Sequence, residues 1–413
     1  MKFHNGRSLI LVLATAGALA TMGACDNKTT DVDDGDGTPP PISAIALRAE
    51  GHGAVDERFT AEVWVVGNVA YTTTWGARIV GGVRTLGNAV KIWDVSGAIP
   101  VLIDSLIVAD VITLGDIQAS DDGKFLVVAT EYSPGSIVIY DLADPRKPQL
   151  ISRFTSGNTV AGVHTAEVQR VNGKLYAFLS VDPSDGPARL VIVDITNPAA
   201  PVEVLSRVMG EPFVHDVFVR DGILMTALWN DGMSIFDIGG GGRGGTVANP
   251  VLLGNVKTAG GNVHNIWWYH DLSDGTERFA FVGEEGPGSL GSSAQGDIHV
   301  VDVSDLTKPR EVAFYSVAGA GTHNFSADEN RGVLFAAFYN GGVRALNVRG
   351  NLGDCISSMR NGGRCDLGKT GREVAQGLTG TGLPVYVWGV QTVGTKLYAS
   401  DMLNGLWKLE TIP

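Results

Sequence analysis

The sequence is poor in cysteine, in positive charge and in long apolar runs. It has 3 cysteines among 413 residues, and 31 Lys and Arg stand against 44 Asp and Glu, which gives a net charge of −13. This acidic balance repels phosphate backbones and argues against nucleic acid as a partner. The chain also lacks a nucleophile elbow, a phosphate-binding glycine loop after a strand and an HExxH helix. The common hydrolase, nucleotide-binding and zinc-protease signatures are therefore missing.

The first apolar run is too short to cross a membrane. Lys2 and Arg7 lead into Ser8–Ala20, a stretch of thirteen residues, whereas a membrane-spanning helix needs ~20 apolar residues. This pattern is typical of a secretory signal peptide. We therefore expect an exported protein. Later in the chain, no run is long and apolar enough to span a membrane.

A cysteine follows directly after this segment. Residues 21–25 read Thr-Met-Gly-Ala-Cys and resemble a lipobox, the bacterial lipoprotein processing site, although Met22 replaces the usual leucine. The resemblance implies cleavage before Cys25 and lipid attachment to its thiol, so that residues 1–24 form a lipoprotein signal peptide. The protein would then be anchored in the cell envelope, with the lipid as its sole membrane contact. The alternative is ordinary secretion, with cleavage after Ala20.

Residues 25–42 form an acidic linker that ends in three prolines. It offers almost no apolar side chains to bury, so we expect a disordered tether that stiffens at the prolines. Its aspartates do not follow the calcium-loop pattern, because Asp31 and Asp33 are followed by Gly35. Residues 43–413 are left as the globular domain.

A short pattern of β-branched and aromatic residues that ends in an acidic residue or Asn recurs along this domain. The copies are Val90–Val95, Ile137–Leu142, Leu190–Ile195, Met233–Ile238, Ile298–Val303, Val343–Val348 and Gly405–Glu410. Spacings of about 43 to 65 residues between copies are typical of propeller blades. A turn and an outer strand follow each of the clear copies, and two strands precede it. In the fourth repeat these are Val217–Val219 and Ile223–Leu228, joined by Asp221-Gly222. Four strands per repeat predict an all-β, up-and-down β-propeller of seven blades, with six to eight left open.

The repeats resemble the LVIVD-repeat proteins, which are predicted β-propellers on exported bacterial and archaeal proteins. The resemblance covers residues 43–413 and is strongest at 186–204, where the chain reads LVIVDITNPAAPVEV. It implies the fold and no particular activity, because the family has no uniform function.

The two ends of the domain are expected to meet. The seventh copy leaves three residues after Glu410, too few for an outer strand. Ile42–Glu50 is strand-like and stands before the first blade. It can supply the missing strand and remove an exposed sheet edge.

Two further features lie outside the repeat. With Cys25 lipidated, Cys355 and Cys365 remain as a pair in an oxidising compartment, which predicts a disulfide that pins the insertion at 351–369. Three long loops, at 75–88, 182–188 and 284–297, fall between the second and third strands of their blades. Such loops lie on one face of a propeller, and they are either a binding surface or tolerated insertions.

Four consecutive blades carry a histidine at the start of the innermost strand. His215, His264 and His323 align with one another, and His164 lies beside them. These positions meet at the mouth of the central channel, and Glu62, Asp116, Asp216 and Trp388 occupy neighbouring places. Converging imidazoles suit a transition metal such as Zn, Cu or Fe, with an open position for a ligand.

Two interpretations of the histidines remain open. They bind a metal or ligand, or they bond backbone groups between blades and were copied by duplication. The sequence favours a non-enzymatic module that binds a protein, glycan or small molecule on this face. The alternatives are a metal-dependent enzyme, an oxidoreductase or hydrolase using these histidines, and a structural envelope protein.

Overall fold

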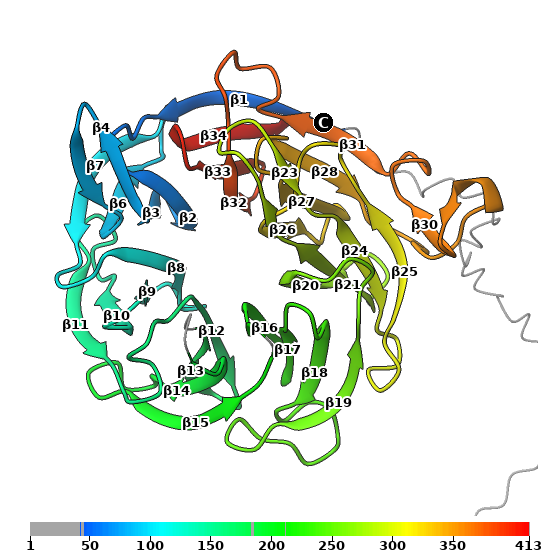
Figure 1. Cartoon of the computed structure of the whole chain (residues 1–413), viewed down its shortest axis with the longest axis horizontal. Coiled ribbons are helices and arrows are strands. Elements are labelled where there is room, and N and C mark those ends of the chain that lie inside the picture. The colour runs from blue at the N-terminus through cyan, green and yellow to red at the C-terminus, as the bar shows by residue number, and fades with distance from the viewer. Residues whose placement is uncertain (1–41, 43–44, 183–185, 211, 413) are drawn as a thin grey trace, which may run out of the picture.

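The computed structural model describes residues 42, 45–182, 186–210 and 212–412. In these ranges the chain forms seven antiparallel blades around a central axis (Figure 1). The fold is an all-β, seven-bladed β-propeller, as the repeat predicted. The predicted signal peptide with Cys25, and the linker apart from Ile42, lie outside the described residues.

Each blade has four main strands, and the innermost begins at the face that we call the top face. The first four blades are β2–β3–β6–β7 (Phe59–Val66, Val69–Trp75, Ala89–Asp94, Val101–Ile107), β8–β11 (Thr113–Ala119, Phe125–Glu131, Ser136–Asp141, Gln149–Phe154), β12–β15 (Thr165–Val171, Lys174–Val181, Arg189–Asp194, Val202–Val208) and β16–β19 (Asp216–Arg220, Ile223–Ala227, Met233–Asp237, Val251–Val256). The last three are β20–β21–β24–β25 (Val263–Asp271, Thr276–Glu284, Ile298–Asp302, Arg310–Tyr315), β26–β27–β28–β31 (Phe325–Asp328, Val333–Ala337, Val343–Asn347, Glu373–Gly377) and β32–β33–β34–β1 (Val387–Val393, Lys396–Asp401, Gly405–Ile412, Ala46–Gly53).

The repeat that revealed the fold forms the third strand of every blade. Its acidic residue or Asn holds the following turn, because the side-chain oxygen accepts a hydrogen bond from the backbone N–H two residues later. This bond is present in six blades at 2.8–3.1 Å, from Asp94, Asp141, Asp194, Asp237, Asp302 and Asn347. Short polar side chains that bond their own backbone favour turns. The preceding apolar residues are buried, as in Leu190–Val193.

The core lies between neighbouring blades rather than inside one of them. Between the second and third blades, Val127 and Ile139 pack with Val168, Leu179 and Val191, all almost completely buried. Each sheet therefore buries both faces against its neighbours, which a single blade cannot do.

The ring is closed by the two ends of the domain. β1 pairs antiparallel with β34, from Ala46 opposite Ile412 to Gly53 opposite Leu406. The predicted closure is correct, but the strand lies a few residues later than the expected Ile42–Glu50. His52 of β1 stacks on Trp407 of β34 at 4.3 Å between ring centroids.

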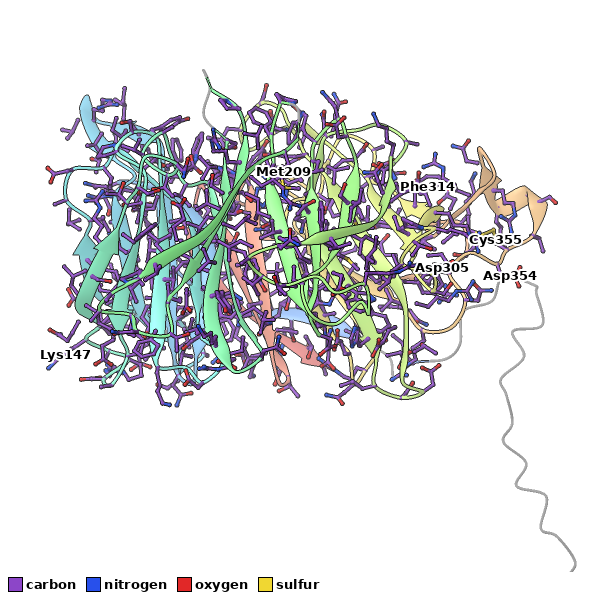
Figure 2. All side chains as sticks on the ribbon, turned by 90° about the horizontal axis from the view of Figure 1, so that it is seen from below. Lys147, Met209, Asp305, Phe314, Asp354 and Cys355 are labelled. Atoms are coloured by element: carbon purple, nitrogen blue, oxygen red, sulfur yellow. A yellow bond between two sulfur atoms is a disulfide. The ribbon has the colours of Figure 1, made fainter. Side chains whose placement is uncertain are left out.

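The insertion that follows the third strand of the sixth blade is attached to the fifth blade. Cys355 and Cys365 form the predicted disulfide. The insertion contains the short helix η1 (Ser357–Met359) and the strands β29 (Arg360–Asn361) and β30 (Arg364–Asp366). β30 pairs in parallel with β25, so the fifth sheet has six strands. Figure 2 shows Cys355 at the side of the disc, beyond Phe314 of β25.

Two of the three long loops contain small hairpins. β4 (Ala77–Val80) pairs with β5 (Val83–Leu86), and β22 (Gly286–Pro287) pairs with β23 (Ala294–Gln295). Among the described residues, no helix is long and apolar enough to cross a membrane.

Candidate functional site

The four predicted histidines lie side by side at the top end of the channel. Consecutive ring centroids are 4.2 Å apart for His164 and His215, 4.1 Å for His215 and His264, and 4.1 Å for His264 and His323. His215, His264 and His323 are buried, with at most 6% of each residue exposed. His164, His215 and His323 lie one or two positions before the start of their innermost strands, and His264 is the second residue of β20.

Three residues from the other blades complete a closed circuit. His323 packs against Trp388 at 4.2 Å, and Trp388 lies 5.9 Å from Trp75. The Trp75 indole N–H donates to Glu131 Oε2 at 2.9 Å, and Glu131 Oε1 lies 2.8 Å from His164 Nδ1. Each blade thus contributes one member. We call this set the mouth ring: Trp75, Glu131, His164, His215, His264, His323 and Trp388.

Glu285 lies against the centre of the histidine arc. It directly follows β21, and its Oε2 is 3.5 Å from His215 Nε2 and 3.8 Å from His264 Nε2. The Tyr339 hydroxyl donates to Glu285 Oε1 at 2.7 Å and so fixes the carboxylate. One ligand atom each from His215, His264 and Glu285 lie within 4.8 Å of one another. Two imidazoles and one carboxylate, with a hydrogen-bonded partner behind, are a donor set that zinc and iron accept.

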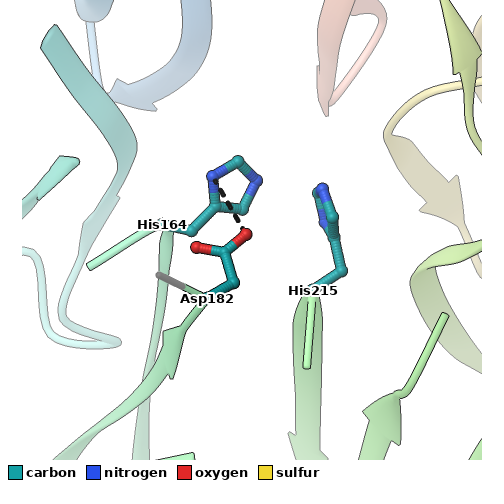
Figure 3. Close-up of side chains that lie close together, drawn as sticks. All are labelled: His164, Asp182 and His215. Carbon is teal, nitrogen blue, oxygen red and sulfur yellow. Dashed lines mark ion pairs between the residues drawn. The ribbon is translucent and has the colours of Figure 1, made fainter. Parts of the chain in front are cut away.

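A second group shares His215. Asp182, which follows β13, places Oδ2 3.9 Å from His164 Nδ1 (Figure 3). Ligand atoms of His164, Asp182 and His215 also lie within 4.8 Å of one another. His164 is therefore held between two carboxylates, Glu131 and Asp182.

The histidines differ in charge. Burial lowers the pKa of His164, but the charges of Asp182 and Glu131 and the contact with Glu131 overcome it and raise the pKa to about 10. Burial lowers the pKa of His215 and His264 well below its usual value, and neighbouring histidines add to the effect. Burial also lowers the pKa of His323 to about 3. At neutral pH the last three are neutral imidazoles, the form that binds metals.

The orientation of His323 is fixed by the backbone. Its Nδ1 lies 2.8 Å from the Trp388 carbonyl oxygen, which can only accept a hydrogen bond, so Nδ1 carries the proton. The lone pair is then on Nε2, which is buried and has no hydrogen-bond partner among the described residues.

Three cavities follow one another along the axis. A top pocket of about 1120 Å³ is lined by Trp75, Glu131, His164, Asp182, Phe213 and Lys257, among others. Below it a chamber of about 40 Å³ shares Trp75, Glu131 and His164 with that pocket. A lower funnel of about 670 Å³ shares Glu62, Asp116, Asp216 and Asn324 with the chamber.

The predicted acidic residues share the chamber with His164, His264 and His323, and they also line the funnel below it. Glu62, Asp116 and Asp216 line the chamber and the funnel, together with Glu167, which the sequence analysis did not select, in the funnel wall. Burial raises the pKa of Glu62 and of Asp216 to about 8, with the charge of Asp116 contributing to both.

Several residues of the site were not selected from the sequence. Glu131, Asp182 and Glu285 lie at or directly after the ends of second strands, and Asp182 and Glu285 fall in loops that had been assigned to the top face. The sequence could therefore have indicated these residues, because the second strand of each blade ends at the face where the innermost strand begins. Tyr339 occupies the matching place in the sixth blade.

A third group lies away from the mouth. His270 Nδ1 is 3.8 Å from Asp221 Oδ2 and 3.5 Å from Glu277 Oε1, and both carboxylates are largely exposed. His270 had not been selected from the sequence. Exposed acidic groups beside a histidine are common without a ligand, so we do not assign a function to it.

Comparisons with known proteins agree with the fold and leave the site unassigned. The LVIVD repeat model matches residues 184–208 and 293–317, so this seven-bladed β-propeller contains LVIVD repeats. A solved structure entitled "Structure of U3-55K" superposes with a TM-score of 0.57 at 12% sequence identity, covering 90% of this chain and 100% of that chain. At that identity the likeness concerns the fold alone. No curated protein matches the chain.

Proposed function

We propose that this propeller is a metal-dependent binding module. His215, His264 and Glu285 hold one transition-metal ion, and the top pocket receives a protein, glycan or small-molecule ligand beside it. The observation that carries the proposal is the convergence of two buried, neutral imidazoles on one carboxylate oxygen, at 3.5 and 3.8 Å. Three protein ligands leave a position open for water or a bound group.

The surroundings of Glu285 favour a ligand role over a structural one. Tyr339 binds Oε1 and leaves Oε2 toward the two histidines. A purely structural carboxylate would be expected to receive N–H donors on both oxygens, because burial without partners is costly. The donor set favours zinc or iron, with copper as a further candidate.

Metal analysis of the purified protein tests the proposal. We expect about one zinc, iron or copper ion per chain, and its loss in the His215→Ala/His264→Ala double variant. Tyr339→Phe should weaken metal affinity by roughly 10–100-fold, because it releases the carboxylate without removing a ligand. His52→Ala, on the outer strand β1, is the matched control. A metal-free wild type, or full metal retention in the double variant, would refute the site.

A second candidate function is metal-dependent catalysis. The observation in its favour is the top pocket of about 1120 Å³, which is lined by Asp182 and His164, and both of these residues lie close to His215 of the proposed site. A metal in that position could activate water or carry out redox chemistry. The identity of the metal separates the two chemistries, because zinc supports hydrolysis and has no redox activity.

We further propose that the protein is exported and held to a membrane of the cell envelope by a lipid on Cys25. The support is the short apolar segment and the small residues before that cysteine. Cell fractionation tests it: wild type should sediment with membranes, and Cys25→Ser should appear in the soluble fraction. Ala24→Ser, which keeps a small residue before the cysteine, is the control. If Cys25→Ser remains with the membranes, the anchor is not this lipid.

A further inference from the structure

We propose a second cation site, independent of the His215/His264/Glu285 site, in the chamber below the mouth ring. Its proposed ligands are Glu62, Asp116, Asp216 and His323, while His164 and His264 also line the chamber. It takes a divalent cation that prefers oxygen ligands, with Mn²⁺ as the probe. The lower funnel is its entrance.

The first argument is the ring of carboxyl groups on the innermost strands. Glu62, Asp116, Glu167 and Asp216 come from four consecutive blades and line the same axial space. The next two blades present amides, Asn265 and Asn324, and the Asn324 amide donates to Glu62 Oε2. The axis is therefore lined by oxygen atoms just below the imidazoles.

The second argument is that, among the described residues, no cationic side chain lies within ion-pair distance of these carboxylates. The charged His164, which also lines the chamber, acts on Asp116 and Asp216 only at longer range. The hydrogen bonds to Glu62, Asp116 and Asp216 come from backbone N–H groups, such as those of Val63 and Ile117, and from the Asn324 amide and the Thr165 hydroxyl. Among the described residues, no Lys, Arg or His forms an ion pair with these carboxylates. Arg220, which also lines the funnel, is already paired with Glu329 at 2.6 and 2.8 Å. Buried charges without such partners are neutralised by protons or by metal ions.

The third argument concerns a nitrogen atom and is independent of the acidic residues. His323 is 3% exposed and forms part of the chamber wall. Its Nδ1 is bound to the Trp388 carbonyl, so the lone pair of Nε2 is left buried without a partner. An unpaired buried acceptor is costly, and a bound ion or its water would satisfy it. His323 does not belong to the His215/His264/Glu285 group.

The volume of the chamber limits the size of the ligand that it can hold. About 40 Å³ holds one ion or one water molecule and excludes an organic ligand. The three carboxylates do not converge within 4.8 Å of one another, so we expect water in the adjoining funnel to complete the coordination of the ion. Mn²⁺ and Mg²⁺ accept such mixed coordination, and carboxylate oxygens suit them better than they suit copper. The shared walls lead from the lower funnel to the chamber, so the ion enters from the face opposite the mouth.

Mn²⁺ binding to the metal-stripped full-length chain tests the inference. Titration followed by electron paramagnetic resonance should show one tightly held Mn²⁺ in wild type. Asp116→Asn/Asp216→Asn should weaken its binding at least tenfold, because both changes keep the side-chain shape and remove the charge. Asp274→Asn, in the exposed β20–β21 turn, is the matched control. Circular dichroism should confirm that the double variant is folded.

Two further variants separate this site from the proposed transition-metal site. Glu285→Gln should leave Mn²⁺ affinity within twofold of wild type, and His323→Gln should reduce it. The inference is overturned if wild type binds no Mn²⁺, or if binding is unchanged in the folded aspartate double variant. It is also overturned if Glu285→Gln abolishes Mn²⁺ binding, since the ion would then belong to the upper site.

Discussion

His299 is the clearest buried charge outside the channel. It lies in β24 with 1% of its side chain exposed, and its Nδ1 is 2.6 Å from Glu311 Oε1. Its Nε2 is 3.3 Å from Glu284 Oε1, and Arg364 of the insertion also contacts Glu311. Burial lowers the pKa of His299, but the two carboxylates outweigh it and raise the pKa to about 9. The imidazolium is thus part of the native structure.

A raised pKa in the folded state predicts how stability depends on pH. The contribution of His299 is fully present below the unfolded pKa of about 6.5 and is lost as pH rises through about 9. We expect His299→Gln to lower the free energy of unfolding by about 3 kcal/mol near pH 6, and by progressively less toward pH ~9. Denaturant unfolding of wild type and His299→Gln at several pH values in this range measures the difference in the free energy of unfolding.

A control substitution without a titratable group should show no such trend. Thr258→Val is suitable, because Thr258 is buried and its hydroxyl has no partner. A difference between wild type and His299→Gln that stays constant with pH would contradict the assigned charge.

At the scale of single residues, the sequence located histidines and missed their partners. Alignment on the third strand brought His215, His264 and His323 into register, because a repeat fixes each position relative to its own blade. Asp182 and Glu285 directly follow second strands, whose ends the third-strand repeat does not mark, so only their loops were assigned to the top face. His299 looked like an ordinary strand residue, and its two carboxylates come from β25 and the end of β21.

At the scale of elements, the third strands were predictable and the additions to them were not. All seven repeat copies form the expected strand. Six of them contain β-branched or aromatic residues followed by a turn residue, whereas in the seventh copy β34 continues past Glu410 to Ile412. The Cys355–Cys365 bridge followed from the cysteine count together with the expected export. The pairing of β30 with β25 did not, because three residues carry no signal for the edge that they will join.

The insertion also changes what its neighbours can do. β30 covers the outer edge of the fifth blade, and Arg364 reaches Glu311 from there. The Arg364 guanidinium lies over the Phe314 ring at 4.8 Å. An edge strand with free backbone groups invites pairing with another chain, and the covering strand prevents it.

At the scale of the whole molecule, closure depends on one strand from the far end of the domain. β1 supplies the outer strand of the seventh blade, and the stack of His52 on Trp407 joins it to β34. Removing β1 would leave β34 as an open edge beside the first blade. The sequence predicted this closure because the seventh repeat has no room for its own fourth strand.

Truncation tests the closure directly. A chain that starts at residue 54 should melt on the order of 10 °C lower than one that starts at residue 45, and it should aggregate through the exposed edge of β34. The chain that starts at residue 45 is the control, because it keeps the whole of β1. Thermal unfolding with light scattering measures both effects. Equal melting temperatures would show that the propeller is closed by other contacts.

The mouth ring has a consequence for how such a protein can acquire a new role. The residues of the mouth ring and Glu285 occupy two kinds of position. One is the start of the innermost strand of a blade, and the other is the end of its second strand. At the latter, Tyr132, Trp229 and Tyr339 hold left-handed backbone conformations with φ of 58°, 50° and 39°. Neither position takes part in the third-strand repeat that builds the scaffold. Substitutions there can replace the chemistry of the channel while the folding information remains intact, so relatives with the same repeat can diverge in ligand without diverging in architecture.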